Sequence, residues 1–252
     1  MIQFEKALEL EKKGEYKKAL QLYKKVEGQY RDKALYRVGQ IYRKGYGCQP
    51  DYDKAINIFS DLARRGNVDG EYMMGLLYFE GEGLQQDYKK ALYWHKLAGE
   101  QGYKYAQYSV GIMYENGWGC VENDREAFEW YYKAALQDYG TAQYRVACHY
   151  YFGLSVEKDI GEAVKWYRRS SDNGFTESKY NLACILLDQG IEREEAIRLL
   201  EDAVREDHWM AAYVLYLSTI NGYGEKTSEE YLSFIYDQLS NTSIENLINK
   251  IK

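Results

Sequence analysis

The feature that most constrains this chain is a repeat of 36 residues. Tyrosine recurs at this spacing in five copies, and a glycine or alanine stands three positions after each tyrosine. The tyrosines are Tyr36, Tyr72, Tyr108, Tyr144 and Tyr180. A fixed period of about 20–50 residues is typical of repeat arrays, in which each repeat packs only against its neighbours. We therefore expect an elongated array rather than a single compact core.

Each repeat predicts two helices joined by a short glycine loop. In the first full repeat, Val38, Ile41 and Tyr42 recur at three-and-four spacing on one helix face, and Gly45 suits the end of that helix. Aspartates at equivalent positions predict the N-caps of the second helices: Asp51, Asp87 and Asp159, with Asp124 displaced by one residue. The small residues let the two backbones approach, and an aromatic residue fills the adjacent gap. The predicted fold class is all-α, with about six to seven helix-turn-helix repeats.

The pattern also predicts where the array begins and ends. Repeats start near residues 34, 70, 106, 142, 178 and 211, so the array covers residues 33–240. The fifth repeat is shorter, because Ala163 and Ala196 are 33 residues apart. Residues 1–32 predict an N-terminal capping helix pair like a tetratricopeptide unit, and residues 241–252 predict a C-terminal capping helix that contains Ile244 and Leu247.

The residues that recur at equivalent positions of the repeats resemble the Sel-one-like repeat (SLR) family, which is related to tetratricopeptide repeats. The match is clearest over "AQYSVGIMYENGWGCVENDREAFEWYYKAALQDYGTAQY", and the resemblance covers roughly residues 33 to 236. It implies a right-handed α/α superhelical solenoid with a concave groove, used for adaptor and scaffold work rather than catalysis. Some cysteine-rich members are linked to penicillin binding, which leaves a hydrolase as a remote alternative. The paired cysteines that mark those members are missing here.

The four cysteines are expected to be free and mostly buried. Cys48 and Cys120 share a loop position that holds Leu84 and Val156 in the other repeats. Cys148 and Cys184 share one first-helix position in neighbouring repeats, where a spacing of about 9 Å between helices exceeds the roughly 7 Å limit for a disulfide. Four free thiols favour a reducing compartment, most simply the cytoplasm.

No catalytic, metal or cofactor site is expected. His95 and His149 stand at positions that are apolar or aromatic in the other repeats, so both are predicted to be packed side chains, and His208 lies in a linker before Trp209. The sequence contains no phosphate-binding loop, GxSxG elbow, HExxH helix or zinc-type cysteine spacing. We therefore expect a protein that is not an enzyme.

The charge distribution disfavours nucleic acid as a partner. The net charge is −6, which repels phosphate. Residues 1–47 hold twelve Lys or Arg against six Asp or Glu, so the remainder of the chain is strongly acidic. No run of about 18 apolar residues is present, so no membrane insertion is expected. The first residues also lack the basic start and apolar core of a signal peptide.

The expected binding surface is the face of the first helices that lines the groove. It combines the tyrosines and the variable position beside them with basic residues at the entrance of the groove, in the first full repeat, and with apolar residues in later repeats. Its residues are Lys33, Tyr36, Arg37, Gln40, Arg43, Lys44, Tyr72, Met73, Phe79, Tyr105, Tyr108, Ser109, Tyr144, Arg145, Tyr151, Tyr180 and Asn181, and Phe152 adds apolar surface beside Tyr151. Tyr213 continues the tyrosine column in the sixth repeat. The tyrosines could equally serve packing alone.

Two classes of function fit these observations. The first is a non-catalytic adaptor that binds a protein or an extended peptide in the groove, with aromatic or aliphatic anchors and an acidic end in the partner. The second is a structural module that associates weakly with itself, head to tail, through its basic N-terminal part and the acidic region around Glu194, Glu195, Glu201 and Asp202.

Overall fold

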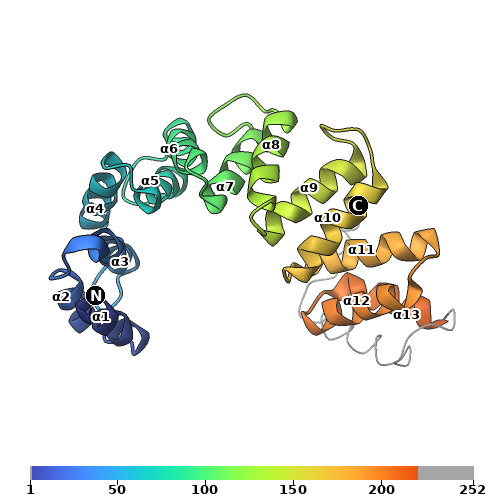
Figure 1. Cartoon of the computed structure of the whole chain (residues 1–252), viewed down its shortest axis with the longest axis horizontal. Coiled ribbons are helices and arrows are strands. Elements are labelled where there is room, and N and C mark those ends of the chain that lie inside the picture. Colours follow the sequence, from blue (N-terminus) through green and yellow to red (C-terminus); the bar gives the residue numbers. More distant parts are fainter. Residues whose placement is uncertain (1, 221–252) are drawn as a thin grey trace. The chain divides into compact units, whose positions relative to one another are not determined.

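The computed structural model describes residues 2–220, and within that range the protein is an all-α repeat solenoid of thirteen helices without a strand (Figure 1). The fold class predicted from the 36-residue period is therefore confirmed. The first helices of the repeats are α3 (Arg31–Lys44), α5 (Val68–Glu80), α7 (Lys104–Glu115), α9 (Gly140–Phe152), α11 (Thr176–Gln189) and α13 (Trp209–Ile220). The second helices are α4 (Tyr52–Arg64), α6 (Tyr88–Glu100), α8 (Asp124–Ala135), α10 (Ile160–Asp172) and α12 (Arg193–Arg205).

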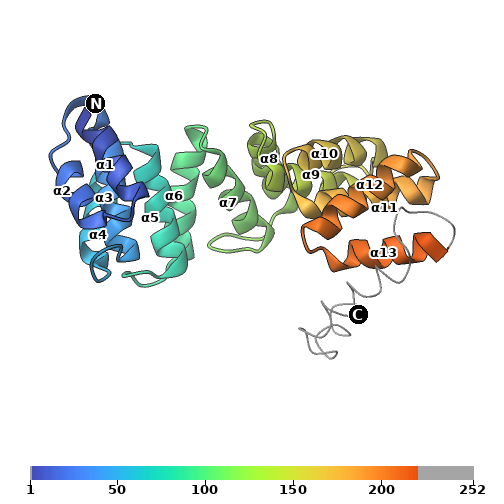
Figure 2. The ribbon, with the colours of Figure 1, turned by 90° about the horizontal axis from the view of Figure 1, so that it is seen from below.

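The chain divides into two compact units, Met1–Ala134 and Ala135–Lys252, called unit 1 and unit 2 below. In unit 1, α3 to α7 follow one another side by side, each helix packing on the next (Figure 2). In unit 2, α9 to α13 do the same. Each unit thus has its own series of helix-to-helix contacts, as expected for a repeat array.

An N-terminal helix pair precedes the first full repeat. It consists of α1 (Ile2–Lys12) and α2 (Tyr16–Tyr23), followed by a single 3₁₀ turn at Gly28–Tyr30. Phe4, Ala7, Ala19 and Tyr23 form one buried cluster with Val38 and neighbouring residues of α3. The pair therefore covers the side of α3 that would otherwise be exposed. The capping role of residues 1–32 stays a prediction.

Small residues in the first helices face aromatic rings of the second helices. A Cβ atom added to Gly39 would lie 2.6 Å from the ring of Phe59, and one added to Gly111 would lie 2.5 Å from the ring of Tyr131. The same position in the second repeat is Gly75, which faces the ring of His95. Because carbon atoms pack at about 3.5–4.0 Å, any side chain here would separate the two helices. These three glycines thus set the distance between the two helices of the first three repeats.

The predicted caps are largely confirmed, with one correction. Asp51, Asp87 and Asp159 each accept a hydrogen bond from a backbone amide in the first turn of α4, α6 and α10. At the start of α8 this role belongs to Asn123, whose side chain accepts from the amides of residues 125 and 126, and not to Asp124. Asparagine is as effective an N-cap as aspartate, so the column is continuous after all.

The end of the array lies outside the described residues. Helix α13 supplies the first helix of the sixth repeat, but the rest of the predicted array to residue 240 and the predicted helix 241–252 fall beyond residue 220. Within residues 2–220, none of the helices combines the length and apolar character that crossing a bilayer requires.

Candidate functional site

In the first four repeats the tyrosine of the first helix is half-buried rather than open. Its ring packs on the aromatic residue of its own repeat that faces the small residue, at centroid distances of 6.0 Å for Tyr36 and Phe59, 5.5 Å for Tyr108 and Tyr131, and 5.9 Å for Tyr144 and Tyr167. Tyr72 packs on His95 in the same way, at 5.3 Å. These tyrosines therefore stabilise the repeats, and only part of each ring borders the surface.

In unit 1, two of the expected groove residues are buried, which corrects the prediction. Met73 is only 1% exposed and belongs to the core around Phe59 and Leu77. Arg43 is 8% exposed and bonds through its guanidinium to Glu80 (2.6 Å) and Glu82. Neither side chain is available to a partner.

Burial of Arg43 opposes its charged form, but the hydrogen bonds and charges of Glu82 and Glu80 outweigh this effect and raise the pKa of Arg43 above its ordinary value. The residue joins α3 to the end of α5 and the loop that follows. It is therefore an ion-pair link between repeats rather than part of a basic groove mouth.

The other basic residues of the expected mouth are exposed. Lys33, Arg37 and Lys44 all reach solvent, and Arg37 also pairs with Glu11 at 3.3 Å. The amide of Gln40 donates to the hydroxyl of Tyr36 (2.9 Å) and to the sulfur of Met73, which fixes its position beside Arg37 on α3. This part of unit 1 presents positive charge next to a polar side chain.

Three tyrosines cluster further along unit 1. The ring of Tyr72 lies 5.1 Å from Tyr103 and 6.5 Å from Tyr105, and the rings of Tyr103 and Tyr105 are 5.4 Å apart. Asp69 adjoins them, and its burial raises its pKa, although Lys33 and the hydroxyl of Tyr103 oppose the shift. Tyr103 and Asp69 were not predicted, because Tyr103 lies just before α7 and outside the pattern of exposed helix positions.

The remaining predicted residues of unit 1 lie partly at the surface. Phe79 packs against Tyr88 at the start of α6 and Trp118 in the loop after α7, at 5.3 and 5.2 Å between ring centroids. Ser109 is half-exposed, and its hydroxyl donates to the carbonyl oxygen of Tyr105. These residues border the first-helix face.

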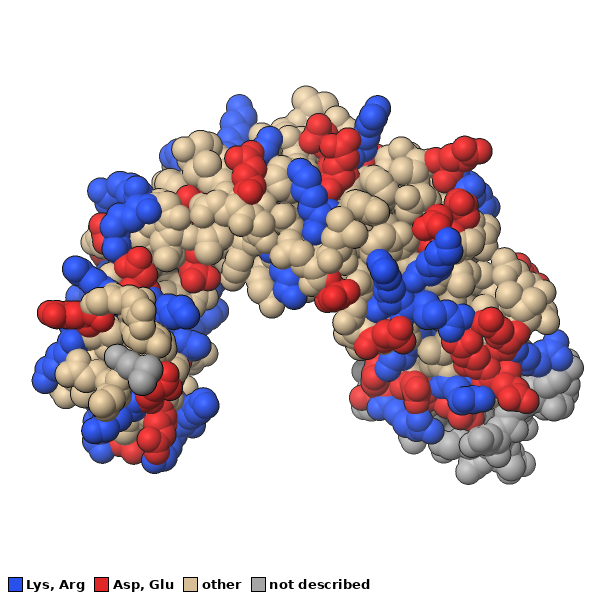
Figure 3. All heavy atoms as spheres, viewed as in Figure 1, with Lys and Arg blue, Asp and Glu red and all other residues tan. Residues whose placement is uncertain are grey.

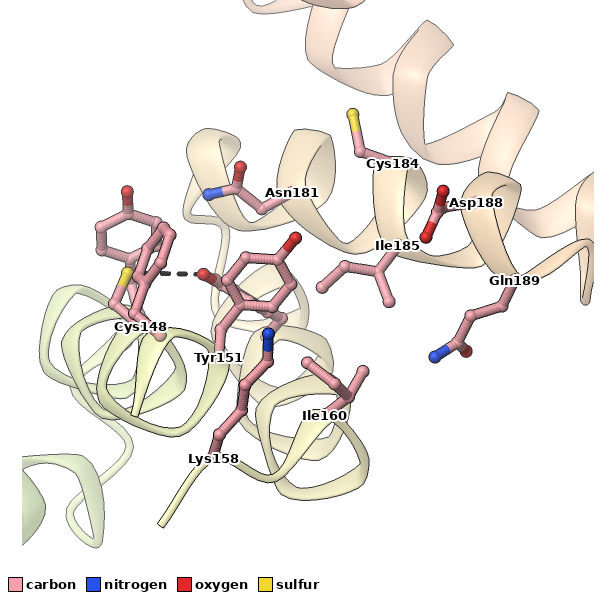
Figure 4. A pocket seen from close by; sticks show the side chains of 12 residues that line it. Cys148, Tyr151, Lys158, Ile160, Asn181, Cys184, Ile185, Asp188 and Gln189 are labelled. Atoms are coloured by element: carbon pink, nitrogen blue, oxygen red, sulfur yellow. Dashed lines mark hydrogen bonds between the residues drawn. The ribbon is translucent and has the colours of Figure 1, made fainter. Parts of the chain in front are cut away.

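Unit 2 contains a cavity with a volume of about 640 Å³. Helices α9 and α11 form two of its walls, and the loop before α10 and the start of α10 form another (Figure 4). The predicted residues Tyr144, Tyr151 and Asn181 all line it. Phe152, also expected on this face, lines it as well. The residues that were not predicted are Cys148, Lys158, Ile160, Tyr167, Cys184, Ile185, Asp188 and Gln189.

The inner wall of this pocket is a set of phenols and thiols. The sulfur of Cys148 lies 3.4 Å from the hydroxyl of Tyr167 (Figure 4). Burial, together with the nearby Cys148, raises the pKa of Tyr144 to about 12, and burial also raises the pKa of the Cys184 thiol. Tyr144 and Cys184 are therefore neutral at physiological pH. Their side chains offer hydrogen bonds and apolar contact.

The outer part of the pocket carries two separate charges. Lys158 extends from the loop before α10, with its ammonium 5.8 Å from the ring centre of Tyr151. Asp188 and Gln189 lie at the end of α11, beyond the apolar side chain of Ile185 (Figure 4). Among the described residues, neither Lys158 nor Asp188 forms a salt bridge.

Two further predicted residues of unit 2 lie outside this pocket. Tyr180 packs on the ring of His208 at 4.7 Å, and burial raises its pKa to about 12. Arg145 is half-buried on α9 and does not line the cavity. The pocket is therefore centred nearer the C-terminal ends of α9 and α11 than the tyrosine column suggested.

The histidines and cysteines follow the predictions in part. His95 and His149 are each 1% exposed, as expected for packed side chains. All four cysteines are unbridged, but they are less buried than predicted: Cys48 is exposed, and Cys120, Cys148 and Cys184 are half-buried. Within residues 2–220, no group of three or more His, Cys, Asp or Glu side chains is placed to hold a metal ion.

The acidic region expected to mediate self-association carries its own counterions. Glu195 pairs with Arg168, Glu194 lies 3.7 Å from Arg198, and Asp202 pairs with Arg205. The part of unit 2 that contains α12 and α13 accordingly shows acidic and basic side chains side by side (Figure 3). Internal neutralisation weakens the long-range attraction that head-to-tail association would need.

Comparison with known proteins identifies the repeats. A sequence model of the Sel1 repeat matches four consecutive segments, residues 32–67, 68–103, 104–139 and 140–175. The chain belongs to the Sel1 repeat family. Sel1 repeat proteins generally act as protein-interaction scaffolds. A search of curated proteins found no match to this Sel1 repeat protein.

Two solved structures are similar over most of this Sel1 repeat protein. A Sel1 repeat protein from Oxalobacter formigenes is 24% identical with a TM-score of 0.84, and the match covers 95% of this chain and all of that one. A protective antigen present in uropathogenic Escherichia coli strains, which displays an SLR fold, is 27% identical with a TM-score of 0.79. That match covers 89% of this chain, which spans half the length of the antigen.

Proposed function

We propose that this protein is a non-catalytic adaptor that holds an extended segment of another protein against its first helices. The observation that carries the proposal is the pocket of unit 2, where α9 and α11 expose phenol, amide and aliphatic groups together. A pocket that combines aromatic surface with a few polar groups suits side chains of a peptide. Its inner groups Tyr144 and Cys184 are neutral, so neither is ready to act as the base that hydrolysis would need.

The chemistry proposed for the partner is an acidic end together with aromatic or aliphatic anchors. In unit 1, the exposed Lys33 and Lys44 support the acidic end. In unit 2, Ile160 and Ile185 support an apolar anchor. The proposal includes a reducing compartment, the cytoplasm, which the four unbridged cysteines support.

The proposal is tested by capturing the partner from the native cell extract with the full-length chain and then measuring its affinity. Asn181→Ala in the pocket and Arg37→Ala in unit 1 should each weaken binding by about fivefold or more, which corresponds to about 1 kcal/mol. The matched control is Arg125→Ala on α8, because the Arg125 side chain is 84% exposed and belongs to a second helix. If the control variant loses the partner while both first-helix variants bind it normally, the second-helix face is the functional one.

The self-association alternative is decided by sedimentation of the purified chain over a wide concentration range at low and high salt. We expect a monomer throughout, because the acidic residues of α12 have partners within unit 2. A mass that grows with concentration at low salt and returns to the monomer at high salt would favour head-to-tail association instead.

A further inference from the structure

The five repeats provide an internal comparison that singles out Phe152. The last residue of α9 is Phe152, and the equivalent residues of the other first helices are all polar: Lys44, Glu80, Asn116 and Asp188. Phe152 is nevertheless 62% exposed, and Leu154, two residues later, is 51% exposed. An aromatic side chain left in solvent at a position where the same fold uses polar residues does not serve the packing of the repeat. Exposed aromatic residues of this kind are typical of docking sites.

The surroundings of Phe152 extend the apolar surface into the pocket. Its ring meets the ring of Tyr151 edge-on, with centroids 4.9 Å apart, and Phe152 itself lines the cavity. Ile160 and Ile185 stand on opposite sides of the opening (Figure 4). One aliphatic or aromatic side chain entering between the two isoleucines would be covered by Phe152 at the rim.

The charges at the rim indicate what should flank that side chain. Lys158 is the only charged residue of the loop before α10 that lines the pocket, and the adjoining Asp159 is engaged in capping α10. Asp188 lines the pocket from the end of α11. Lys158 and Asp188 are exposed and form no salt bridge among the described residues, so both charges are available to groups of opposite sign.

We infer that the pocket of unit 2 recognises an extended peptide segment in which one aliphatic or aromatic residue is flanked by an acidic residue on one side and a basic residue on the other. The apolar side chain lies between Ile160 and Ile185 under Phe152, the acidic residue faces Lys158, and the basic residue faces Asp188. This inference rests on the proposed adaptor function and names the segment that unit 2 selects.

The test begins with a displayed library of random 12-residue peptides, selected on the immobilised full-length chain. The enriched peptide, labelled with fluorescein, and a second peptide with its acidic and basic residues exchanged are then titrated against each protein variant by fluorescence anisotropy. We expect the enriched peptides to share the acidic, apolar and basic pattern. Phe152→Asn, which introduces the residue found at the equivalent position of the third repeat, should weaken binding at least tenfold.

The charge assignment is tested by exchange. Lys158→Glu and Asp188→Lys should each weaken the selected peptide about threefold to fivefold, as expected for exposed charge pairs. The variant that carries both changes should prefer the charge-exchanged peptide. Leu136→Asp is the matched control, because Leu136 is also an exposed apolar residue of unit 2 and aspartate occupies its equivalent position at Asp172. This control should bind the selected peptide like the wild type.

Each outcome bears on one of the two proposals. Selection that enriches no peptide, enriched peptides without the charge pattern, or unchanged binding by Phe152→Asn would overturn the inference about the segment. If the native partner is still lost in the Asn181→Ala and Arg37→Ala variants, the adaptor function stands without it. If those two variants also bind the partner normally, the first-helix surface itself is not the binding site.

Discussion

The carboxylate of Glu71 accepts a 2.7 Å hydrogen bond from the side-chain amide of Gln101. Two repeats later, the position equivalent to Glu71 is occupied by Gln143. There the side-chain oxygen of Gln143 accepts from the amide of Asn173 at 2.8 Å, and the nitrogen of Gln143 donates to the carbonyl oxygen of Ala135. Glu71 is only 4% exposed and, when ionised, has no hydrogen to donate.

Because Glu71 has no such donor, one hydrogen bond between adjacent helices is missing in unit 1. Gln107 and Gln143 each donate to the carbonyl eight residues earlier, that of Gly99 at 3.0 Å and that of Ala135 at 3.2 Å. The equivalent carbonyl for Glu71 is that of Ala63, which accepts from turn amides at the end of α4 and, among the described hydrogen bonds, from no side chain. Glutamate at this position therefore lacks one bond between adjacent helices that glutamine makes in the next two repeats.

Glu71→Gln should accordingly raise the free energy of unfolding at pH 7 by about 1 kcal/mol, the typical net value of a buried hydrogen bond. Burial raises the pKa of Glu71, and the hydrogen bond from Gln101 only partly opposes this shift. A raised pKa in the folded state means that the wild type is more stable when Glu71 is protonated, and loses this contribution as the pH rises through the folded pKa. Urea unfolding of both proteins between pH 4 and pH 8 measures the effect.

The gain from Glu71→Gln should therefore be largest at neutral pH and shrink toward pH 4. Glu100→Gln is the control, because Glu100 is exposed on α6 and exposed substitutions usually change stability by less than about 0.5 kcal/mol. Equal stability of wild type and Glu71→Gln at pH 7 would show that the carbonyl of Ala63 is adequately solvated.

Arg43→Ala should lower the free energy of unfolding by about 2–3 kcal/mol, because it leaves two partly buried carboxylates without their cation. Glu80 and Glu82 retain 41% and 28% side-chain exposure, so water reduces the loss below that of a fully buried pair. Arg43→Met keeps most of the aliphatic packing and separates the charge effect from the loss of volume. Thermal unfolding in low and high salt gives the measurement, and a loss below 0.5 kcal/mol for Arg43→Ala would contradict the link between repeats.

The four thiols should be reduced in the purified protein, and a reductant should leave the melting temperature unchanged. Their reactivity with a thiol reagent should differ, because the thiolate is the reacting form. Cys48 is exposed and should react first, whereas burial raises the pKa of Cys120 and of Cys184 and should slow both. Mass spectrometry of partially labelled protein locates the modified residues. A large fall in melting temperature on reduction would instead indicate a disulfide.

The repeat pattern predicted the fold because periodic residues decide it. Gly39 and Phe59 face each other as the small and aromatic columns required, and Asp51 caps α4 as its position indicated. Each of these contacts depends on residues within one repeat, so the 36-residue spacing carries the information. The same reasoning correctly predicted that His95 would be buried, because its column is aromatic in other repeats.

The candidate site was predicted less completely, since it depends on departures from the pattern. Met73 and Arg43 were each expected at the surface because of their places on the first helices. Met73 instead packs in the core, and Arg43 forms ion pairs with carboxylates of the next repeat. The pocket walls Ile160 and Ile185 come from different repeats, and no periodic column joins them. The one available signal was Phe152, an aromatic residue in a polar column.

The last prediction concerns the approach of neighbouring repeats in unit 1, at Gly119. This glycine has a φ of +78°, and a Cβ atom there would lie 2.4 Å from the carbonyl oxygen of Tyr88, which is backbone and cannot move aside. Gly66 has a similar φ of +73° but no atom within 4 Å of the added carbon. Gly66→Ala should therefore cost about 1 kcal/mol, from the left-handed conformation alone. Gly119→Ala should cost at least about 1 kcal/mol more, because the added methyl group must also push the loop away from α6. Urea unfolding of the two variants gives the comparison, and equal losses would show that the loop shifts freely.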